Sequence, residues 1–253
     1  MSEPERMRTV LVFSGLDPSG GAGIGADLAA IAAQGVHALP VVTALTVQDQ
    51  NRVYGVEPVD AALIARQVAA LLAATRIDAV KIGIPGSRAN ADAIAGAVVR
   101  LREHYPGLPV VLDPVLASGC GDALSRGDAR AALAPLLALA SIATPNALEA
   151  AALDTGACEH VLVTGGHGEG TQVVNWWHGP NQRREWRWER LPGQFHGSGC
   201  TLAAAIAARL ALGEPLAMAL DMAQAYVHRT LVASYSIGAG QRIPRRFHAG
   251  SPN

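Results

Sequence analysis

Lysine is almost absent from this 253-residue sequence, and Lys81 is the only one. Arginine supplies nearly all of the 20 positive charges, which 21 acidic residues balance to a net charge of −1. Aromatic residues are also scarce, at 4% of the chain. A nearly neutral chain has no electrostatic footprint for nucleic acid or for an acidic membrane surface, so we expect neither as a partner.

Long apolar runs and a cysteine framework are missing as well. No apolar stretch approaches the roughly 20 residues that cross a bilayer, and the N-terminal MSEPERMRTV contains no apolar signal region. Cys120, Cys158 and Cys200 are far apart and odd in number, which fits neither a metal site nor a disulfide framework. The sequence therefore predicts a protein of the reducing cytoplasm.

Half of the residues are hydrophobic, enough for a large core, and we expect residues 1–253 to form one α/β domain. Short apolar runs predict strands at residues 10–14, 39–45, 79–83, 110–112, 142–144 and 161–164. Segments with apolar residues at helical spacing predict helices at residues 24–34, 61–74, 89–102 and 128–139. This alternation predicts a mostly parallel central sheet with helices on both faces.

The pattern changes in the last third of the chain. Two runs flank the turn-rich segment HGPNQ and predict an antiparallel hairpin near residues 171–190. Trp186 and Trp188 alternate with charged residues in the second run, so both are expected on the same side. Two further helices are predicted at residues 201–212 and 215–232.

Glycine-rich and acidic motifs gather where the predicted strands end. Their positions are Gly15, Gly83, Asp113, Asn146 and Gly165. In a parallel sheet, ligands bind outside the carboxyl ends of the strands. This clustering is stronger evidence for a functional site than any one of the motifs.

The segment LPGQFHGSGCTLA is the most informative of these motifs. Its tight turn leads into a helix, so the backbone N–H groups of Gly197, Ser198 and Gly199 and the helix dipole form an anion site. The dipole is also expected to lower the pKa of the Cys200 thiol. In the alternative interpretation, Cys200 is a small buried apolar residue. A nucleophilic pair with His196 is less favoured, because adjacent glycine and serine donors suit phosphate binding better.

Four other motifs each have a functional and a purely structural interpretation. The segment at residues 15–27, GLDPSGGAGIGAD, permits close approach of a ligand or is a tight strand-to-helix turn. Asp113 is placed for a metal or phosphate, or is a loop aspartate before proline. Glu149 is a candidate Mg²⁺ ligand, or it forms a capping box with Asn146. Residues 164–167, TGGH, contact a nucleotide through the backbone or form a simple turn.

Together these motifs resemble the hydroxymethylpyrimidine/phosphomethylpyrimidine kinases of thiamine biosynthesis, in the ribokinase-like superfamily. The resemblance spans nearly the whole chain. Its segments are GLDPSGGAGIGAD (15–27), TALTVQ (43–48), KIG (81–83), VLDPV (111–115), TPNALEA (144–150), VTGGH (163–167) and HGSGCT (196–201). It implies a three-layer sandwich and a homodimer that uses ATP and Mg²⁺. It also implies phosphorylation of the hydroxymethyl group of 4-amino-5-hydroxymethyl-2-methylpyrimidine, which many members follow by phosphorylating the monophosphate.

The resemblance also implies roles for individual residues. The pyrimidine pocket would be lined by Gly15, Asp27, Gln48 and Ile84, and the nucleotide by Thr164, Gly165 and Gly166. Mg²⁺ and phosphate would be organised by Asp113 and Glu149, and the anion hole formed by Gly197, Ser198 and Gly199. Cys200 would stand at the position of the catalytic base. The Gln48 amide offers both a donor and an acceptor, which match an aminopyrimidine edge.

Three departures from the family pattern leave the second phosphorylation open. The segment between Glu149 and Val161 is short, and two common lysines are replaced, one near Gly119 and one by Thr164. Arginines 183, 184 and 187 are candidates to compensate for these lysines. Two other functions remain as alternatives: a pyridoxine/pyridoxal kinase on the same scaffold, and a non-catalytic pyrimidine sensor.

Overall fold

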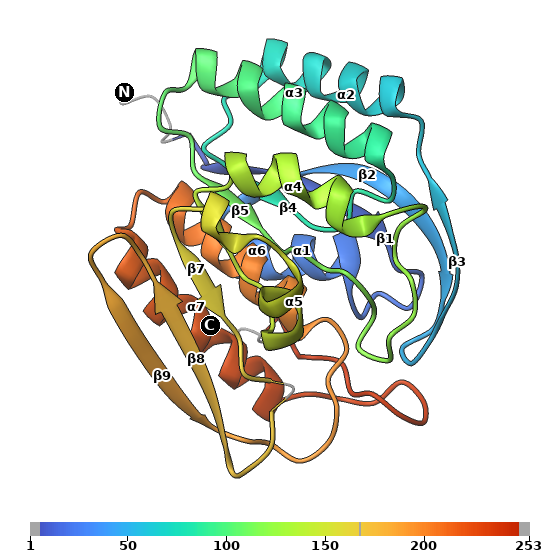
Figure 1. Cartoon of the computed structure of the whole chain (residues 1–253), viewed down its shortest axis with the longest axis vertical. Coiled ribbons are helices and arrows are strands. Elements are labelled where there is room, and N and C mark those ends of the chain that lie inside the picture. The colour runs from blue at the N-terminus through green and yellow to red at the C-terminus, as the bar shows by residue number, and fades with distance from the viewer. Residues whose placement is uncertain (1–5, 167, 248–253) are drawn as a thin grey trace, which may run out of the picture.

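The computed structural model describes residues 6–166 and 168–247, and in this part of the chain nine strands form a single sheet (Figure 1). The strands are β1 (Thr9–Leu16), β2 (His37–Gln48), β3 (Val53–Pro58), β4 (Ala79–Ile82), β5 (Val110–Leu112), β6 (Ile142–Ala143), β7 (Val161–Val163), β8 (Gln172–His178) and β9 (Arg183–Glu189). Their order is β3-β2-β1-β4-β5-β6-β7-β8-β9. The six strands from β2 to β7 in that order are parallel, whereas the pairs β2–β3, β7–β8 and β8–β9 are antiparallel.

Helices cover both faces of the sheet, each with its own apolar core. The helices are α1 (Gly23–Ala32), α2 (Ala61–Ala74), α3 (Arg88–His104), α4 (Ala129–Leu139), α5 (Ala147–Ala152), the 3₁₀ turn η1 (Thr155–Ala157), α6 (Ser198–Ala211) and α7 (Leu216–Val232). Helices α2, α3 and α4 pack on one face, and α1, α6 and α7 on the other (Figure 1). Among the helices in residues 6–166 and 168–247, none combines the length and apolar composition needed to cross a membrane.

Local sequence explains where several helices begin. The side chains of Asp60, Ser87 and Asp128 accept backbone N–H bonds at the starts of α2, α3 and α4. Such N-cap bonds satisfy donors that have no partner within the helix. The strand order and pairings confirm the predicted mostly parallel sheet, with helices on both faces and an antiparallel hairpin near residues 171–190.

The structure differs from the prediction at two places that matter for the site. Strand β3 was not predicted, because Gly55 and Pro58 interrupt its apolar pattern. Helix α6 begins at Ser198, three residues before the predicted start. Gly197 adopts a left-handed conformation with φ of 79°, which glycine reaches without strain, and it ends the preceding loop. Ser198 and Gly199 therefore belong to the first turn of α6.

The strand order places the loops with glycine-rich and acidic motifs together. The chain adds β2 on one side of β1 and later adds β4 on the other side. The order in which strands are added therefore reverses between β1 and β4. A crevice opens at such a switch point, outside the carboxyl ends of the strands. Gly15 in β1, Gly83 after β4 and Asp113 after β5 all lie at this edge.

The hairpin of β8 and β9 packs against α7. The Trp186 indole N–H donates to the Asp221 carboxylate at 2.7 Å, and the Trp188 ring stacks on His228 with 5.1 Å between centroids. Asp221 and His228 both belong to α7. The prediction that the two tryptophans face the same side is confirmed, and their role there is packing.

Candidate active site

Two glycine-rich loops meet at the carboxyl edge of the sheet. One follows β1 and leads into α1, and the other precedes α6. A side chain at Gly197 would collide with the carbonyl oxygen of Gly21, so the two backbones are in contact. Helices α1 and α6 therefore begin side by side, and the N–H groups and dipoles of both point towards one region.

Asp17 and His196 join the two loops through side chains. The buried Asp17 carboxylate lies 2.8 Å from His196 Nε2, and it accepts the backbone N–H of Ser19 at 2.8 Å and of Ala22 at 2.7 Å. Burial alone would raise the pKa of Asp17, but the bonds from His196, Ser19 and Ala22 lower it overall. A side chain at Gly21 would occupy the place of the His196 ring. His196 is thus paired with Asp17 rather than with Cys200.

Beneath the loops lies a buried ion pair between Lys81 and Asp27. Both side chains are completely buried, and 2.8 Å separates Lys81 Nζ from Asp27 Oδ2. Burial raises the pKa of Asp27 against the attraction of Lys81. Burial would lower the pKa of Lys81, but the attraction of Asp27 and other acidic groups raises it instead. The carboxylate of Asp27, which the family resemblance assigns to the pyrimidine pocket, has no exposed surface and is paired with Lys81.

Lys81 is the residue of this cluster that the motif analysis missed. It lies on β4, one residue from the strand end, and a side chain at Gly83 would lie 2.8 Å from its ammonium nitrogen. Gly83 therefore leaves the space that the Lys81 ammonium occupies. The signal in the sequence was that the chain retains a single lysine, within the segment KIG.

Asp113 lies against the first turn of α6. A Cβ built on Gly199 would lie 3.8 Å from both carboxylate oxygens of Asp113. Burial raises the pKa of Asp113 to about 6; the charge of Asp27 adds to this shift, and Lys81 opposes it. The structure thus brings the predicted anion hole and this predicted metal ligand together.

The pKa of the Cys200 thiol is shifted upward, whereas the sequence predicts a downward shift. Burial raises the pKa of Cys200 to about 12; Lys81 opposes the shift, while the charges of Asp113 and Asp27 add to it. The prediction of a lowered thiol pKa is wrong, because desolvation and two nearby carboxylates outweigh the helix dipole. At neutral pH the resting group is therefore a thiol.

The capping-box interpretation of Glu149 is confirmed, and its role as a Mg²⁺ ligand stays a prediction. It forms a capping box at the start of α5: its Oε2 accepts the Asn146 N–H at 2.8 Å, and the Asn146 side chain accepts the Glu149 N–H at 2.9 Å. Burial, followed by repulsion from Asp113, raises the pKa of Glu149 to about 7. Two neighbouring carboxylates with raised pKa values fit a divalent cation, which would remove their repulsion.

Protein side chains alone do not complete a metal site here. In the described residues, no three or more His, Cys, Asp or Glu side chains come together as a metal-binding group. A Mg²⁺ ion held by Asp113 and Glu149 would therefore take its other ligands from phosphate oxygens and water, as Mg²⁺ does in many phosphoryl-transfer sites.

The loop after β7 holds the predicted nucleotide-binding residues Thr164, Gly165 and Gly166, while His167 of the same motif lies outside the described residues. Thr164 bridges to Asn146, which places this loop beside the start of α5. A side chain at Gly165 would collide with the carbonyl oxygen of Val174 in β8. This close backbone approach gives a physical reason for glycine at that position.

Arg190 supplies a positive charge to this loop. Its guanidinium donates to the carbonyl oxygens of Gly166 at 2.8 Å and of Gly165 at 3.3 Å. Two of the arginines considered as replacements for the missing lysines form ion pairs away from this loop, Arg184 with Asp221 and Arg187 with Glu185. The third, Arg183, is exposed at the start of β9. Arg190, just beyond β9, was not predicted because its loop contacts lie 20 or more residues away in sequence.

The predicted substrate-binding residues other than Asp27 lie at the ends of β1, β2 and β4, around the switch point. A side chain at Gly15 would lie 2.6 Å from the Ile84 side chain, so these two residues adjoin. Gln48 is half-buried at the end of β2. The turn after Gln48 is held by the C-terminal segment, since Gln50 donates to the Ala239 carbonyl at 3.0 Å. A contact between distant parts of the chain therefore fixes the turn next to Gln48.

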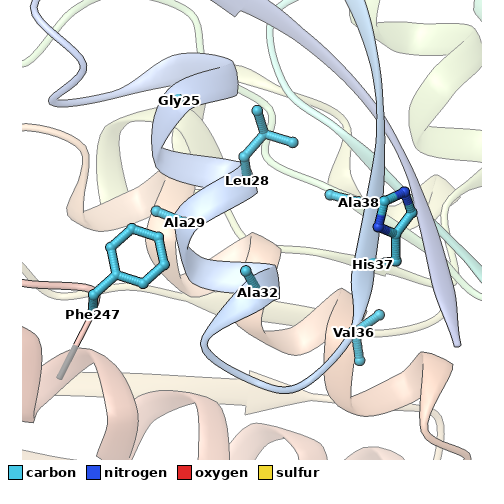
Figure 2. Close-up of a pocket in the computed structure, with 8 residues that line it drawn as sticks. All are labelled: Gly25, Leu28, Ala29, Ala32, Val36, His37, Ala38 and Phe247. Atoms are coloured by element: carbon cyan, nitrogen blue, oxygen red, sulfur yellow. The ribbon is translucent and has the colours of Figure 1, made fainter. Parts of the chain in front are cut away.

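A separate apolar groove of about 360 Å³ lies on the outer side of α1 (Figure 2). It is lined by Gly25, Leu28, Ala29, Ala32, Val36, His37, Ala38 and Phe247. Among the described residues that line it, His37 is the only titratable one, and none is a predicted catalytic or metal-binding residue. The groove therefore does not belong to the candidate active site.

Comparisons with known proteins agree with this arrangement. The family model for phosphomethylpyrimidine kinase matches residues 17–158 and 154–244. A relative from Rhizobium meliloti, named hydroxymethylpyrimidine/phosphomethylpyrimidine kinase, is 38% identical over 267 aligned positions that cover 94% of this chain and 96% of the relative.

Solved structures show the same fold. An ADP complex of Bacillus subtilis pyridoxal kinase superposes with a TM-score of 0.84 at 25% identity, over 95% of this chain and 98% of that one. A phosphomethylpyrimidine kinase from Clostridium difficile superposes with a TM-score of 0.74 at 29% identity, over 89% of this chain and 100% of that one. With its family match, its relatives and its strand-end motifs in agreement, the chain belongs to the phosphomethylpyrimidine kinase family.

Proposed function

We propose that this protein transfers the γ-phosphoryl group of ATP to the hydroxymethyl group of 4-amino-5-hydroxymethyl-2-methylpyrimidine. The observation that carries the proposal is the position of Asp113 against Gly199, where the first turn of α6 begins. This arrangement places backbone N–H donors next to a carboxylate that can hold a cation. Phosphoryl transfer depends mainly on such positioning and charge stabilisation.

In the proposed reaction, the substrate hydroxyl oxygen forms a bond to the γ-phosphorus while the bond from that phosphorus to the β–γ bridging oxygen breaks. The electron pair of that bond leaves with ADP. The N–H groups of Ser198 and Gly199 stabilise the charge on the transferred phosphoryl oxygens. Asp113 and Glu149 would hold Mg²⁺, which when bound neutralises phosphate charge. Gly165 and Gly166 would contact the nucleotide, and Gln48 would read the aminopyrimidine edge.

The state of Cys200 changes the assignment of the proton acceptor. With its pKa raised to about 12, the thiol is protonated at neutral pH and is a poor general base. We assign it the role of orienting the substrate hydroxyl, whose proton passes to an oxygen of the transferred phosphoryl group. Cys200→Ala should then lower kcat by less than the roughly 10²-fold expected for loss of a general base.

The direct test is a product assay with purified protein, ATP, Mg²⁺ and the pyrimidine, followed by ³¹P NMR. We expect ADP and the pyrimidine monophosphate. The same spectra report whether diphosphate follows, a step left open by the two missing lysines, one near Gly119 and one replaced by Thr164. Absence of ADP formation would instead favour the non-catalytic sensor.

Pyridoxal kinase is the second candidate, favoured by the superposition on the Bacillus subtilis enzyme. Its substrate also presents a hydroxymethyl group on an aromatic nitrogen ring. Steady-state kinetics with both substrates separates the two, since a higher kcat/KM for pyridoxal would refute the pyrimidine assignment. We also expect a homodimer, as the family resemblance implies, and sedimentation velocity tests it.

A further inference from the structure

Arg246 is a buried guanidinium that contacts both glycine-rich loops. Only 5% of the residue is exposed. Its Nη2 donates to the carbonyl oxygen of Gly21 at 2.5 Å and to that of Gly197 at 3.4 Å, and its Nε donates to Thr201 Oγ1 at 2.9 Å. Gly21 precedes α1, whereas Gly197 and Thr201 belong to the start of α6. One side chain therefore bridges the N-termini of both helices.

The charge of Arg246 is not neutralised by a direct ion pair. Within residues 6–166 and 168–247, no carboxylate lies within ion-pair distance of its guanidinium, and its bonds go to carbonyl and hydroxyl oxygens. Burial lowers the pKa of Arg246, but an arginine remains charged at neutral pH. A buried cation without a counterion is costly to the fold. A bound anion near these helix N-termini would offset that cost.

The bonded carbonyls set the direction of the neighbouring N–H groups. The Gly197 carbonyl and the Ser198 N–H belong to one planar peptide and point in opposite directions. That carbonyl is held by Arg246 and also by Thr201, whose hydroxyl donates at 2.7 Å and whose N–H donates at 3.0 Å. The Ser198 N–H is thereby directed away from Arg246.

The chain around Arg246 fixes its position from both sides. The Tyr226 hydroxyl of α7 donates to the Arg246 carbonyl at 2.9 Å. The next residue, Phe247, lines the groove on the outer side of α1 with Gly25 and Ala29 (Figure 2). Arg246 itself lies beyond residue 244, where the match to the family model ends.

We propose that Arg246 is a positioning residue for phosphoryl transfer, which holds the two glycine-rich loops together and adds positive charge behind the N–H groups that bind the transferred phosphoryl. This inference rests on the proposed kinase function. It differs from the roles assigned to Asp113, Glu149 and Cys200, because Arg246 acts through the loop backbone.

The test compares Arg246→Gln and Arg246→Lys with the matched control Arg245→Gln. Arg245 is the adjacent arginine, but it is exposed and donates to the Ala233 carbonyl outside the two loops. Misplacement of the anion-binding groups should lower the kcat of Arg246→Gln by about 10- to 100-fold while the KM for the pyrimidine stays nearly unchanged. Arg246→Lys keeps the charge and should recover part of the loss, and Arg245→Gln should match the wild type.

Chemical rescue separates positioning from a loss of folding. Arg246→Ala leaves a space shaped for guanidinium, and millimolar guanidinium should raise its kcat more than methylammonium at the same concentration. Urea titration of each variant supplies the folded fraction. Wild-type kcat for folded Arg246→Gln would overturn the proposal.

Binding of an ATP analogue keeps this test independent of the substrate assignment. If the wild type fails to phosphorylate the pyrimidine, the proposed function fails, and Mg-AMP-PCP titrated into each variant by calorimetry still reports on Arg246. An affinity at least about tenfold weaker in Arg246→Gln than in Arg245→Gln supports the proposal. Equal affinities in the two variants, together with equal kcat where turnover is measurable, refute it.

Discussion

Replacing Lys81 by methionine tests the buried charge cluster beneath the candidate active site. The substitution keeps a long side chain and removes a cation that lies 2.8 Å from Asp27 with no exposed surface on either group. Breaking such a pair leaves an uncompensated buried charge and costs about 3–5 kcal/mol. Because domains are typically stable by about 5–15 kcal/mol, Lys81→Met should fold at 25 °C with much of its stability lost.

Urea unfolding at about pH 8, followed by fluorescence of the tryptophans, measures this loss. The matched control is Arg100→Met on α3, an exposed cation without a salt bridge among the described residues, which should change stability by less than about 0.5 kcal/mol. Adding Asp27→Asn to Lys81→Met removes the stranded charge, so the double variant should lose less than the sum of the single variants.

The pH dependence gives a second check with a defined sign. Without Lys81, the strongest influence that opposes the burial-driven rise in the pKa values of Asp27 and Asp113 is lost. A carboxyl whose pKa is raised on folding favours the fold at low pH and disfavours it as the pH rises through that pKa. Lys81→Met should therefore lose less stability at about pH 5 than at about pH 8. A loss below about 1 kcal/mol, or one equal at both pH values, would refute the reasoning.

Three further predictions concern the site itself. Gly197→Ala should lower the free energy of unfolding by at least about 1–3 kcal/mol and impair turnover, because φ is 79° and the added Cβ would meet the Gly21 carbonyl. The control Gly213→Ala has a φ of 85° but open space around it, so the same urea and kinetic assays give the backbone cost alone. The Mg²⁺ concentration for half-maximal activity should rise as the pH falls through about 7 and 6, because the raised pKa values of Glu149 and Asp113 protonate the cation ligands; a pH-independent value would contradict this. At neutral pH, iodoacetamide should label the exposed Cys120 before Cys200, and mass spectrometry showing the reverse order would refute a protonated Cys200.

The roles of single side chains could be predicted only where they depend on near neighbours in sequence. Asn146 and Glu149 are three residues apart, and their capping box formed as the spacing indicated. His196 and Cys200 are also close in sequence, yet His196 pairs with Asp17, 179 residues away. Arg190 and Arg246 likewise reach loops that are distant along the chain.

Apart from β3, the sequence by itself determined the order of the main strands and helices, the mostly parallel sheet and the gathering of motifs at its carboxyl edge. These follow from local periodicity and from glycine and capping residues, which act over a few residues. Only the tertiary structure decided that Asp27 is buried against Lys81, that Cys200 is a protonated thiol and that Arg246 bridges two helix starts. Desolvation and charge pairing depend on which distant segments pack around a group, and neither can be read from local spacing.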